Sequence, residues 1–312
     1  MPKKILNGVV ALVCLALVVG GLTLWRRPVA VFKCVNRGTL VLAGFQKVHV
    51  DSPVGRQTVF EAGQGRTLVF LHGAGNNAGV WSRTAPQVLK WKRYHIVIPD
   101  LPGHADSAPS QGILRYETLR DGVAAVLAAK GGREPMILVG NSLGARIAVL
   151  YAHAHPERVA RVVAVNGGPL RGPLPNLTPA NRREAWDLFD RMLDRGTPRP
   201  PGFILDDVIR LAREGPIGRL YAAAREVRSW EEYRLEGRMS EVRTPVDLVW
   251  GESDRLYPPD YPRLMQAELP GVRVTTIPQC GHIPAQECPA AFNAVLEKIL
   301  AEPPPAPKEG KS

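Results

Sequence analysis

The chain has 312 residues, of which 45% are hydrophobic and 22% charged, and it carries a formal net charge of +11 at pH 7 with four cysteines. This apolar content excludes an intrinsically disordered chain, and four cysteines are too few to frame a protein of this length with disulfides. The basic excess is compatible with nucleic acid, an anionic membrane surface or simple solubility, so its distribution along the chain must be considered.

The first predicted element is an uncharged run over residues 5–25. As a helix, these 21 residues span about 30 Å, the thickness of the hydrocarbon core of a bilayer. Trp25 and the pair Arg26-Arg27 suit the headgroup interface. We therefore predict a single-pass membrane anchor with basic flanks over residues 1–27, with a cleaved signal peptide and a buried helix as alternatives.

Most of the positive charge surrounds this apolar run. Residues 1–60 contain eight basic residues and one acidic residue, a net charge of +7, which leaves +4 for the other 252 residues. The charge therefore indicates membrane placement, and we expect no nucleic-acid partner. Basic residues stand on both sides of the run, so the side of the membrane on which the rest of the chain lies stays undecided.

Residues 28–43 are expected to form a linker, after which β-rich and helical segments alternate. The β-rich runs are mostly Val, Ile, Leu, Phe and Thr, and they cover residues 44–50, 57–61, 67–71, 95–99, 136–139, 159–165, 246–250 and 272–277. Amphipathic stretches lie between them, at 118–130, 142–155 and 262–269. Continuous apolar runs are typical of buried parallel strands. We predict a doubly wound, mostly parallel eight-stranded α/β sheet, with its core in residues 44–168 and 244–300.

The alternation is interrupted over residues 169–243, where no strand is predicted. Proline-rich turns there separate three charged amphipathic stretches, at 182–195, 205–213 and 217–228. Basic and acidic residues are nearly balanced in this region, so we expect a solvated helical cap and not a polyanion site. The proline- and lysine-rich residues 301–312 are expected to form a disordered tail.

A G-x-S-x-G pattern over residues 140–144 stands between a predicted strand and a predicted helix. This context is typical of a sharp turn that strains the serine backbone and lifts its hydroxyl above the edge of the sheet. Gly140 and Gly144 suit such a turn, because a side chain at either position would collide with the neighbouring strand or helix. Ser142 is therefore the candidate nucleophile.

A glycine-rich loop at residues 72–75 (HGAG) immediately follows an earlier predicted strand. A loop at this point can supply a backbone N–H that pairs with one beside the nucleophile to form an oxyanion hole. We expect these two donors to be the amides of Ala74 and Leu143. Structural roles are expected for His72 and for His104, which lies in a turn further along the chain.

Two more candidates follow late predicted strands. Asp254 leaves the end of the seventh strand, where a carboxylate can orient a histidine and stabilise its imidazolium form. Glu252 and Asp247 are less favoured, and the loop after the sixth strand contains no acid. His282 follows the eighth strand in a glycine-containing loop. The predicted catalytic triad is therefore Ser142, Asp254 and His282.

These motifs together resemble the α/β-hydrolase superfamily, and the resemblance extends over nearly all of residues 44–300. It is carried by His72-Gly73, PDLPGHADS at 99–107, GNSLG at 140–144, WGESD at 250–254 and Gly281-His282. The resemblance implies the same triad and oxyanion donors, with no cofactor and no metal. Within the superfamily, the chain is similar to membrane-anchored monoacylglycerol-lipase-like serine hydrolases, which also join an amino-terminal membrane helix to a capped hydrolase.

The function predicted on this basis is hydrolysis of carboxylic esters of apolar or lipid-like substrates through an acyl-enzyme. One alternative is a carbon–carbon bond hydrolase of the meta-cleavage-product type. Asn141 and residues 281–286 (GHIPAQ) are similar to the sequence of that branch at these positions. Glu287, however, stands where that branch has an aromatic residue, and the loop at 72–77 (HGAGNN) departs from its glycine pattern. A second alternative is a non-catalytic binding module on the same fold. The sequence leaves open whether Cys280 and Cys288 pair.

Overall fold

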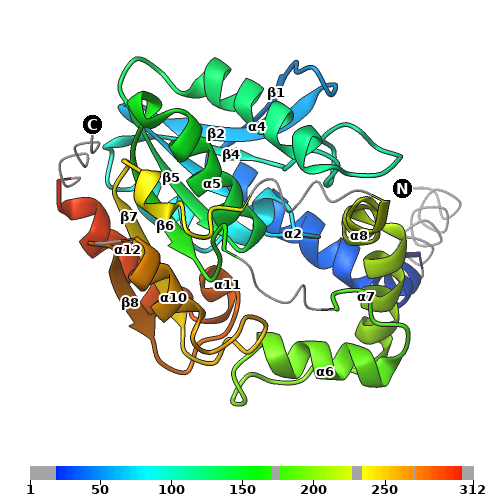
Figure 1. Ribbon diagram of the computed structural model, residues 1–312. Coiled ribbons are helices and arrows are strands. Elements are labelled where there is room, and N and C mark those ends of the chain that lie inside the picture. Colours follow the sequence, from blue (N-terminus) through cyan, green and yellow to red (C-terminus); the bar gives the residue numbers. More distant parts are fainter. Residues whose placement is uncertain (1–18, 171–175, 227–233, 270, 304–312) are drawn as a thin grey trace, which may run out of the picture.

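An eight-stranded sheet forms the centre of the protein, whose computed structural model describes residues 19–170, 176–226, 234–269 and 271–303 (Figure 1). The strands are β1 (Gln46–Val50), β2 (Gln57–Gly63), β3 (Arg66–Leu71), β4 (Tyr94–Pro99), β5 (Met136–Asn141), β6 (Val159–Val165), β7 (Val246–Gly251) and β8 (Arg273–Ile277). Their order is β1-β2-β4-β3-β5-β6-β7-β8. β2 is antiparallel to both β1 and β4, and every other pair is parallel. The predicted mostly parallel eight-stranded sheet is confirmed.

The central strands are buried because both faces of the sheet are covered. In β3, Leu68 and Phe70 pack into one apolar cluster, while Val69 and Leu71 pack into the other. This division follows from the two-residue period of a strand, which points successive side chains to opposite faces. A strand buried on both faces has no polar side, which is why these strands read as continuous apolar runs in the sequence.

Helices form the two outer layers (Figure 1). The cluster on the Val69 face includes apolar residues of α4 (Tyr116–Lys130), α5 (Leu143–Ala154) and α10 (Tyr261–Glu268). The cluster on the Leu68 face includes apolar residues of a 3₁₀ turn, η1 (Ala78–Trp81), and of α3 (Ala85–Leu89), α11 (Pro284–Glu287) and α12 (Pro289–Ala301). The sheet thus lies between two helical layers, as expected for a doubly wound α/β fold.

Among the described residues between β6 and β7, three further helices lie in the segment that the sequence predicts to be the cap. They are α6 (Arg182–Met192), α7 (Gly202–Glu214) and α8 (Pro216–Glu226). The side chain of Asn181 accepts a hydrogen bond from Glu184 N and so caps the start of α6. The end of α6 contacts the loop after β8, because His282 N donates to the carbonyl oxygen of Met192 at 2.6 Å. The cap is therefore attached directly to the loop that carries the candidate histidine.

The segment expected to be a linker, residues 28–43, differs from that expectation. It forms helix α2 (Pro28–Leu42), with a proline in its first turn and Leu40 buried in the core. α2 lies against η1 and against the cap helix α7 (Figure 1). The helix was not evident in the sequence because two of its charged side chains, Lys33 and Arg37, make contacts inside the protein. These contacts obscure its amphipathic pattern.

The predicted membrane anchor lies largely outside the described residues, which begin at 19. Residues 19–26 are helical, and Val19, Leu22, Leu24 and Trp25 are each more than half exposed. No helix within the described part of the chain combines the length and apolarity needed to cross a bilayer. Of the expected tail at 301–312, only the first three residues are described.

Candidate active site

Ser142 occupies a strained turn between β5 and α5. Its backbone has φ 55° and ψ −114°, an unfavourable combination for a residue with a side chain. The glycines on either side permit the tight packing of this turn. A Cβ at Gly140 would lie 2.3 Å from the carbonyl oxygen of Gly144, and a Cβ at Gly144 would lie 2.2 Å from that of Leu71. The turn therefore holds the half-buried Ser142 at the carboxyl end of β5, close to β3.

His282 and Asp254 form a buried pair beside this turn. His282 Nδ1 and Asp254 Oδ2 are 2.8 Å apart, and only 3% and 4% of these residues' surface areas are exposed. Asp254 is fixed by two more donors, Asn166 Nδ2 at 2.7 Å and the backbone N–H of Leu256 at 2.8 Å. A carboxylate with three hydrogen-bond partners has a fixed orientation, so it holds the imidazole in one position.

Two side chains connect the serine turn to the histidine loop. Asn141 Nδ2 donates to the carbonyl oxygen of His282 at 2.9 Å, which ties the end of β5 to that loop. The ring of Tyr257 stacks on the His282 ring at a centroid distance of 5.9 Å, and its hydroxyl lies near the Ser142 side chain. Burial raises the pKa of the Tyr257 hydroxyl. The three predicted triad residues are thus brought together at one end of the sheet.

The predicted oxyanion loop at residues 72–75 lies against the serine turn. A Cβ on Gly73 would be 3.2 Å from Cβ of Ser142. Leu143 is the first residue of α5, so its amide N–H has no acceptor within the helix. Ala74 packs against the same apolar cluster as Leu143. Both predicted donors therefore belong to segments that adjoin Ser142.

The two buried histidines near this loop act as hydrogen-bond acceptors. His72 Nε2 accepts from Leu101 N at 2.9 Å, and His104 Nε2 accepts from Gly75 N at 3.1 Å. Burial lowers the pKa of His104 to about 4 and that of His72 well below its ordinary value. Both rings are therefore neutral at pH 7, as acceptance at Nε2 requires. Their contacts are those of structural residues.

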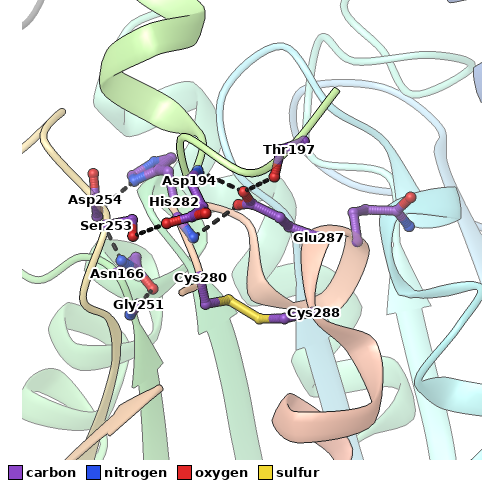
Figure 2. The surroundings of a disulfide bond; sticks show 12 residues. Asn166, Asp194, Thr197, Gly251, Ser253, Asp254, Cys280, His282, Glu287 and Cys288 are labelled. Carbon is purple, nitrogen blue, oxygen red and sulfur yellow. Dashed lines mark hydrogen bonds and ion pairs between the residues drawn. A yellow bond between two sulfur atoms is a disulfide. The ribbon is translucent and has the colours of Figure 1, made fainter. Parts of the chain in front are cut away.

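A third group of contacts joins the cap to the histidine loop (Figure 2). Glu287 accepts from Asp194 N at 2.6 Å, from Thr197 Oγ1 at 2.6 Å and from Gly281 N at 2.8 Å. A disulfide between Cys280 and Cys288 closes the loop that contains Gly281, His282 and Glu287. In the part of the chain that the structure describes, no group of three or more His, Cys, Asp or Glu residues is arranged to hold a metal ion.

The sequence pattern did not indicate Asn166, Tyr257 or Glu287. The loop after β6 contains no acid, and its Asn166 donates to Asp254, the acid after β7. Tyr257 carries no motif of its own, and its role follows only from its stacking on His282. Glu287 stands in the sequence where the meta-cleavage branch has an aromatic residue, and this departure gives no sign of its contacts with Asp194 and Thr197.

A family profile described as the alpha/beta hydrolase family matches residues 68–295 of this chain. The chain belongs to this family. This α/β hydrolase is similar to a solved membrane phospholipase A described as a bacterial virulence factor, with a TM-score of 0.73 and 26% identity, over 96% of this chain and 100% of that one.

Two curated relatives differ in their named activities. One is Lipase 1 of Psychrobacter immobilis, which is 26% identical over 253 residues, covering 75% of this hydrolase and 78% of the lipase. The other is a 2-hydroxy-6-oxo-6-phenylhexa-2,4-dienoate hydrolase of Burkholderia cepacia, 27% identical over 266 residues, covering 77% of this hydrolase and 90% of the relative.

Proposed function

We propose that this protein is a serine hydrolase that cleaves carboxylic esters of apolar or lipid-like molecules. The observation that carries the proposal is the buried His282–Asp254 pair beside a serine at a strained strand-to-helix turn. Because Nδ1 of His282 is engaged with Asp254, its Nε2 is the nitrogen left to exchange a proton with Ser142.

The reaction would proceed through an acyl-enzyme. His282 Nε2 takes the proton from Ser142 Oγ while that oxygen attacks the ester carbonyl carbon, and Asp254 stabilises the resulting imidazolium. The amides of Leu143 and Ala74 donate hydrogen bonds to the oxyanion. Collapse of the tetrahedral intermediate breaks the ester C–O bond, and the leaving alcohol takes the proton from His282. A water molecule then attacks the acyl-enzyme by the same route and releases the acid.

Leu143, beside the nucleophile, is part of the buried apolar cluster that also contains Leu170, Leu220 and Leu235 of the insertion between β6 and β7. The names of two similar proteins, a membrane phospholipase A and a lipase, agree with lipid esters. The predicted anchor at residues 5–25 would hold the site where such substrates partition.

Carbon–carbon bond hydrolysis is the second candidate, favoured by the similarity to the Burkholderia cepacia hydrolase. Asn141, one of the residues that suggested it, donates to the carbonyl oxygens of Val165 and His282, so a structural role accounts for it. Glu287, which stands where that branch has an aromatic residue, accepts a hydrogen bond from Asp194 N instead. Ester hydrolysis therefore remains the preferred function.

Labelling with a fluorophosphonate, which reacts with activated serines, tests the nucleophile. We expect the wild-type protein to be labelled, Ser142→Ala to lose all labelling, and Ser110→Ala, at an exposed serine, to be labelled like wild type. Persistent labelling of Ser142→Ala would refute the assignment. A second assay compares esters of increasing acyl length with a vinylogous diketone. Cleavage of the diketone alone would favour the second candidate.

A further inference from the structure

Helix α2 carries a lysine that reaches the oxyanion loop. Lys33 Nζ donates a hydrogen bond to the carbonyl oxygen of Gly75, the residue directly after the proposed donor Ala74. The N–H of Gly75 donates to His104 Nε2 at 3.1 Å. Both polar groups of the Gly75 backbone are thus bound by side chains, one from α2 and one from the loop after β4.

Gly75 needs such support because it lies in an irregular loop. Its φ of +70° falls in the left-handed region, which glycine adopts without strain. A Cβ at this position would also lie 2.5 Å from Cδ1 of Ile217 on the cap helix α8. Without a strand or helix to align the peptide groups, their directions depend on the side chains that bind them.

The position of Lys33 is fixed by the packing of α2 on the residues that follow this loop. Arg37, one turn further along α2, forms an ion pair with Asp100 at 3.0 Å, and Asp100 accepts from Ala78 N at 2.7 Å. A Cβ on Gly79 would lie only 2.9 Å from Cβ of Asn36. The helix and the segment that continues the oxyanion loop are therefore in direct contact.

We propose that Lys33 is a positioning residue for the oxyanion hole, an inference that rests on the proposed serine-hydrolase function. By binding the carbonyl of Gly75, the ammonium group holds the Gly75–Asn76 peptide, while His104 holds the intervening Ala74–Gly75 peptide. The two contacts together fix the loop and so aim the Ala74 N–H at the reacting carbonyl. The positive charge of Lys33 also favours the oxyanion that develops there, because fixed charges act strongly where water is excluded. The helix that follows the apolar amino-terminal run thereby takes part in organising the catalytic centre.

The protonation state of Lys33 gives this inference a distinct signature. Burial lowers its pKa to about 8, and the nearby carboxylates of Asp207 on α7 and Asp100 after β4 oppose that shift. The other titratable groups that face it, His72 and His104, are neutral. Raising the pH through about 8 therefore removes the ammonium charge, and we expect the turnover number to fall over that range.

The test measures ester hydrolysis between pH 6 and 9.5 and the rate of fluorophosphonate labelling for Lys33→Met, with Lys90→Met at an exposed lysine as the matched control. At pH 7, we expect Lys33→Met to lower kcat and the labelling rate by about 10- to 100-fold, with KM changed less than about threefold. The fall of kcat above about pH 8 that we expect for wild type should be absent in Lys33→Met. Lys33→Arg, which keeps a donor and a charge, should recover part of the rate and move the decline to higher pH.

Asp207→Asn provides a test in which Lys33 is unchanged. Loss of this carboxylate should lower the pKa of Lys33 and move the alkaline decline to lower pH, a shift that a purely structural role would not produce. A Lys33→Met enzyme with wild-type kcat and pH profile would overturn the inference while leaving the function intact. The inference would also be overturned if kcat of Asp207→Asn fell at the same pH as that of wild type. A wild-type protein that neither hydrolyses esters nor is labelled would instead overturn the proposed function.

Discussion

At the scale of single residues, the orientation of His282 depends on Asp254, and that of Asp254 depends on Asn166. We predict that Asp254→Asn lowers kcat for ester hydrolysis by about 10⁴-fold, because an amide can hold the imidazole in the wrong tautomer. Glu252→Gln, at an exposed carboxylate two residues earlier, should retain wild-type kcat. If Asp254→Asn kept near-normal turnover, a different acid would have to support His282.

His104 gives a residue-scale prediction about stability. Burial lowers its pKa to about 4, so between about pH 4 and 6.5 the unfolded chain binds more protons than the folded one. The free energy of unfolding contributed by this group therefore falls as the pH falls, by about 2 kcal/mol between pH 7 and pH 5. His104→Gln keeps an acceptor for Gly75 N–H but does not titrate.

Urea unfolding at pH 7 and pH 5 measures this effect as a difference between variant and wild type. The comparison is needed because burial raises the pKa of Asp100 to about 6. Protonation of Asp100 therefore increases the free energy of unfolding as the pH falls, which opposes the effect of His104 over much of the same pH range. We expect wild type to lose more stability than His104→Gln on acidification. Equal losses in the two proteins would mean that His104 titrates normally in the folded state.

At the scale of secondary structure, the disulfide and the short helix α11 hold the loop that carries His282. We predict that Cys280→Ala combined with Cys288→Ala lowers the free energy of unfolding by about 2 kcal/mol, since the bond closes a short loop across eight positions of sequence. Urea unfolding checks this value, and Cys34→Ser, at an exposed free cysteine, is the control. Unchanged stability in the double variant would show that the loop is held by its hydrogen bonds alone.

The sequence predicted well those elements that have a clear local pattern, either a continuous apolar run or a recognisable motif. The buried strands β3 to β7 are mostly apolar on both faces, apart from the buried ion pair of Arg161 and Asp247, and the turn around Ser142 has its pattern between a strand and a helix. Helix α2 was missed because Lys33 and Arg37 point to polar partners in the protein. Whether a charged residue faces water or a buried carbonyl depends on segments far away in the chain, which local periodicity does not contain.

The same reasoning applies to the site as a whole. Ser142, Asp254 and His282 are recognisable because each follows a strand, and parallel strands bring their carboxyl ends to one edge. Asn166 also follows a strand, β6, but its amide does not mark a catalytic acid, and Tyr257 and Lys33 have no such marker. Their roles arise from contacts between segments that are brought together only by folding, such as α2 against the oxyanion loop.

At the scale of the whole molecule, the basic residues that flank the predicted anchor lead us to predict that the chain is attached to a membrane. We predict that the full chain stays in the membrane pellet after alkaline extraction, whereas a chain that begins at residue 28 is released. The truncation keeps α2 and its contacts, so its ester hydrolysis in detergent should match that of the full chain. Release of the full-length protein by alkali would contradict the anchor.

The bond between Cys280 and Cys288 bears on which side of a membrane the hydrolase works. Structural disulfides persist in oxidising compartments and are rare in the reducing cytosol. Both cysteines lie in the catalytic part of the chain. We therefore expect the part of the chain that contains this bond to work in an oxidising compartment, which would place it on the oxidising side of the membrane that the predicted anchor would cross.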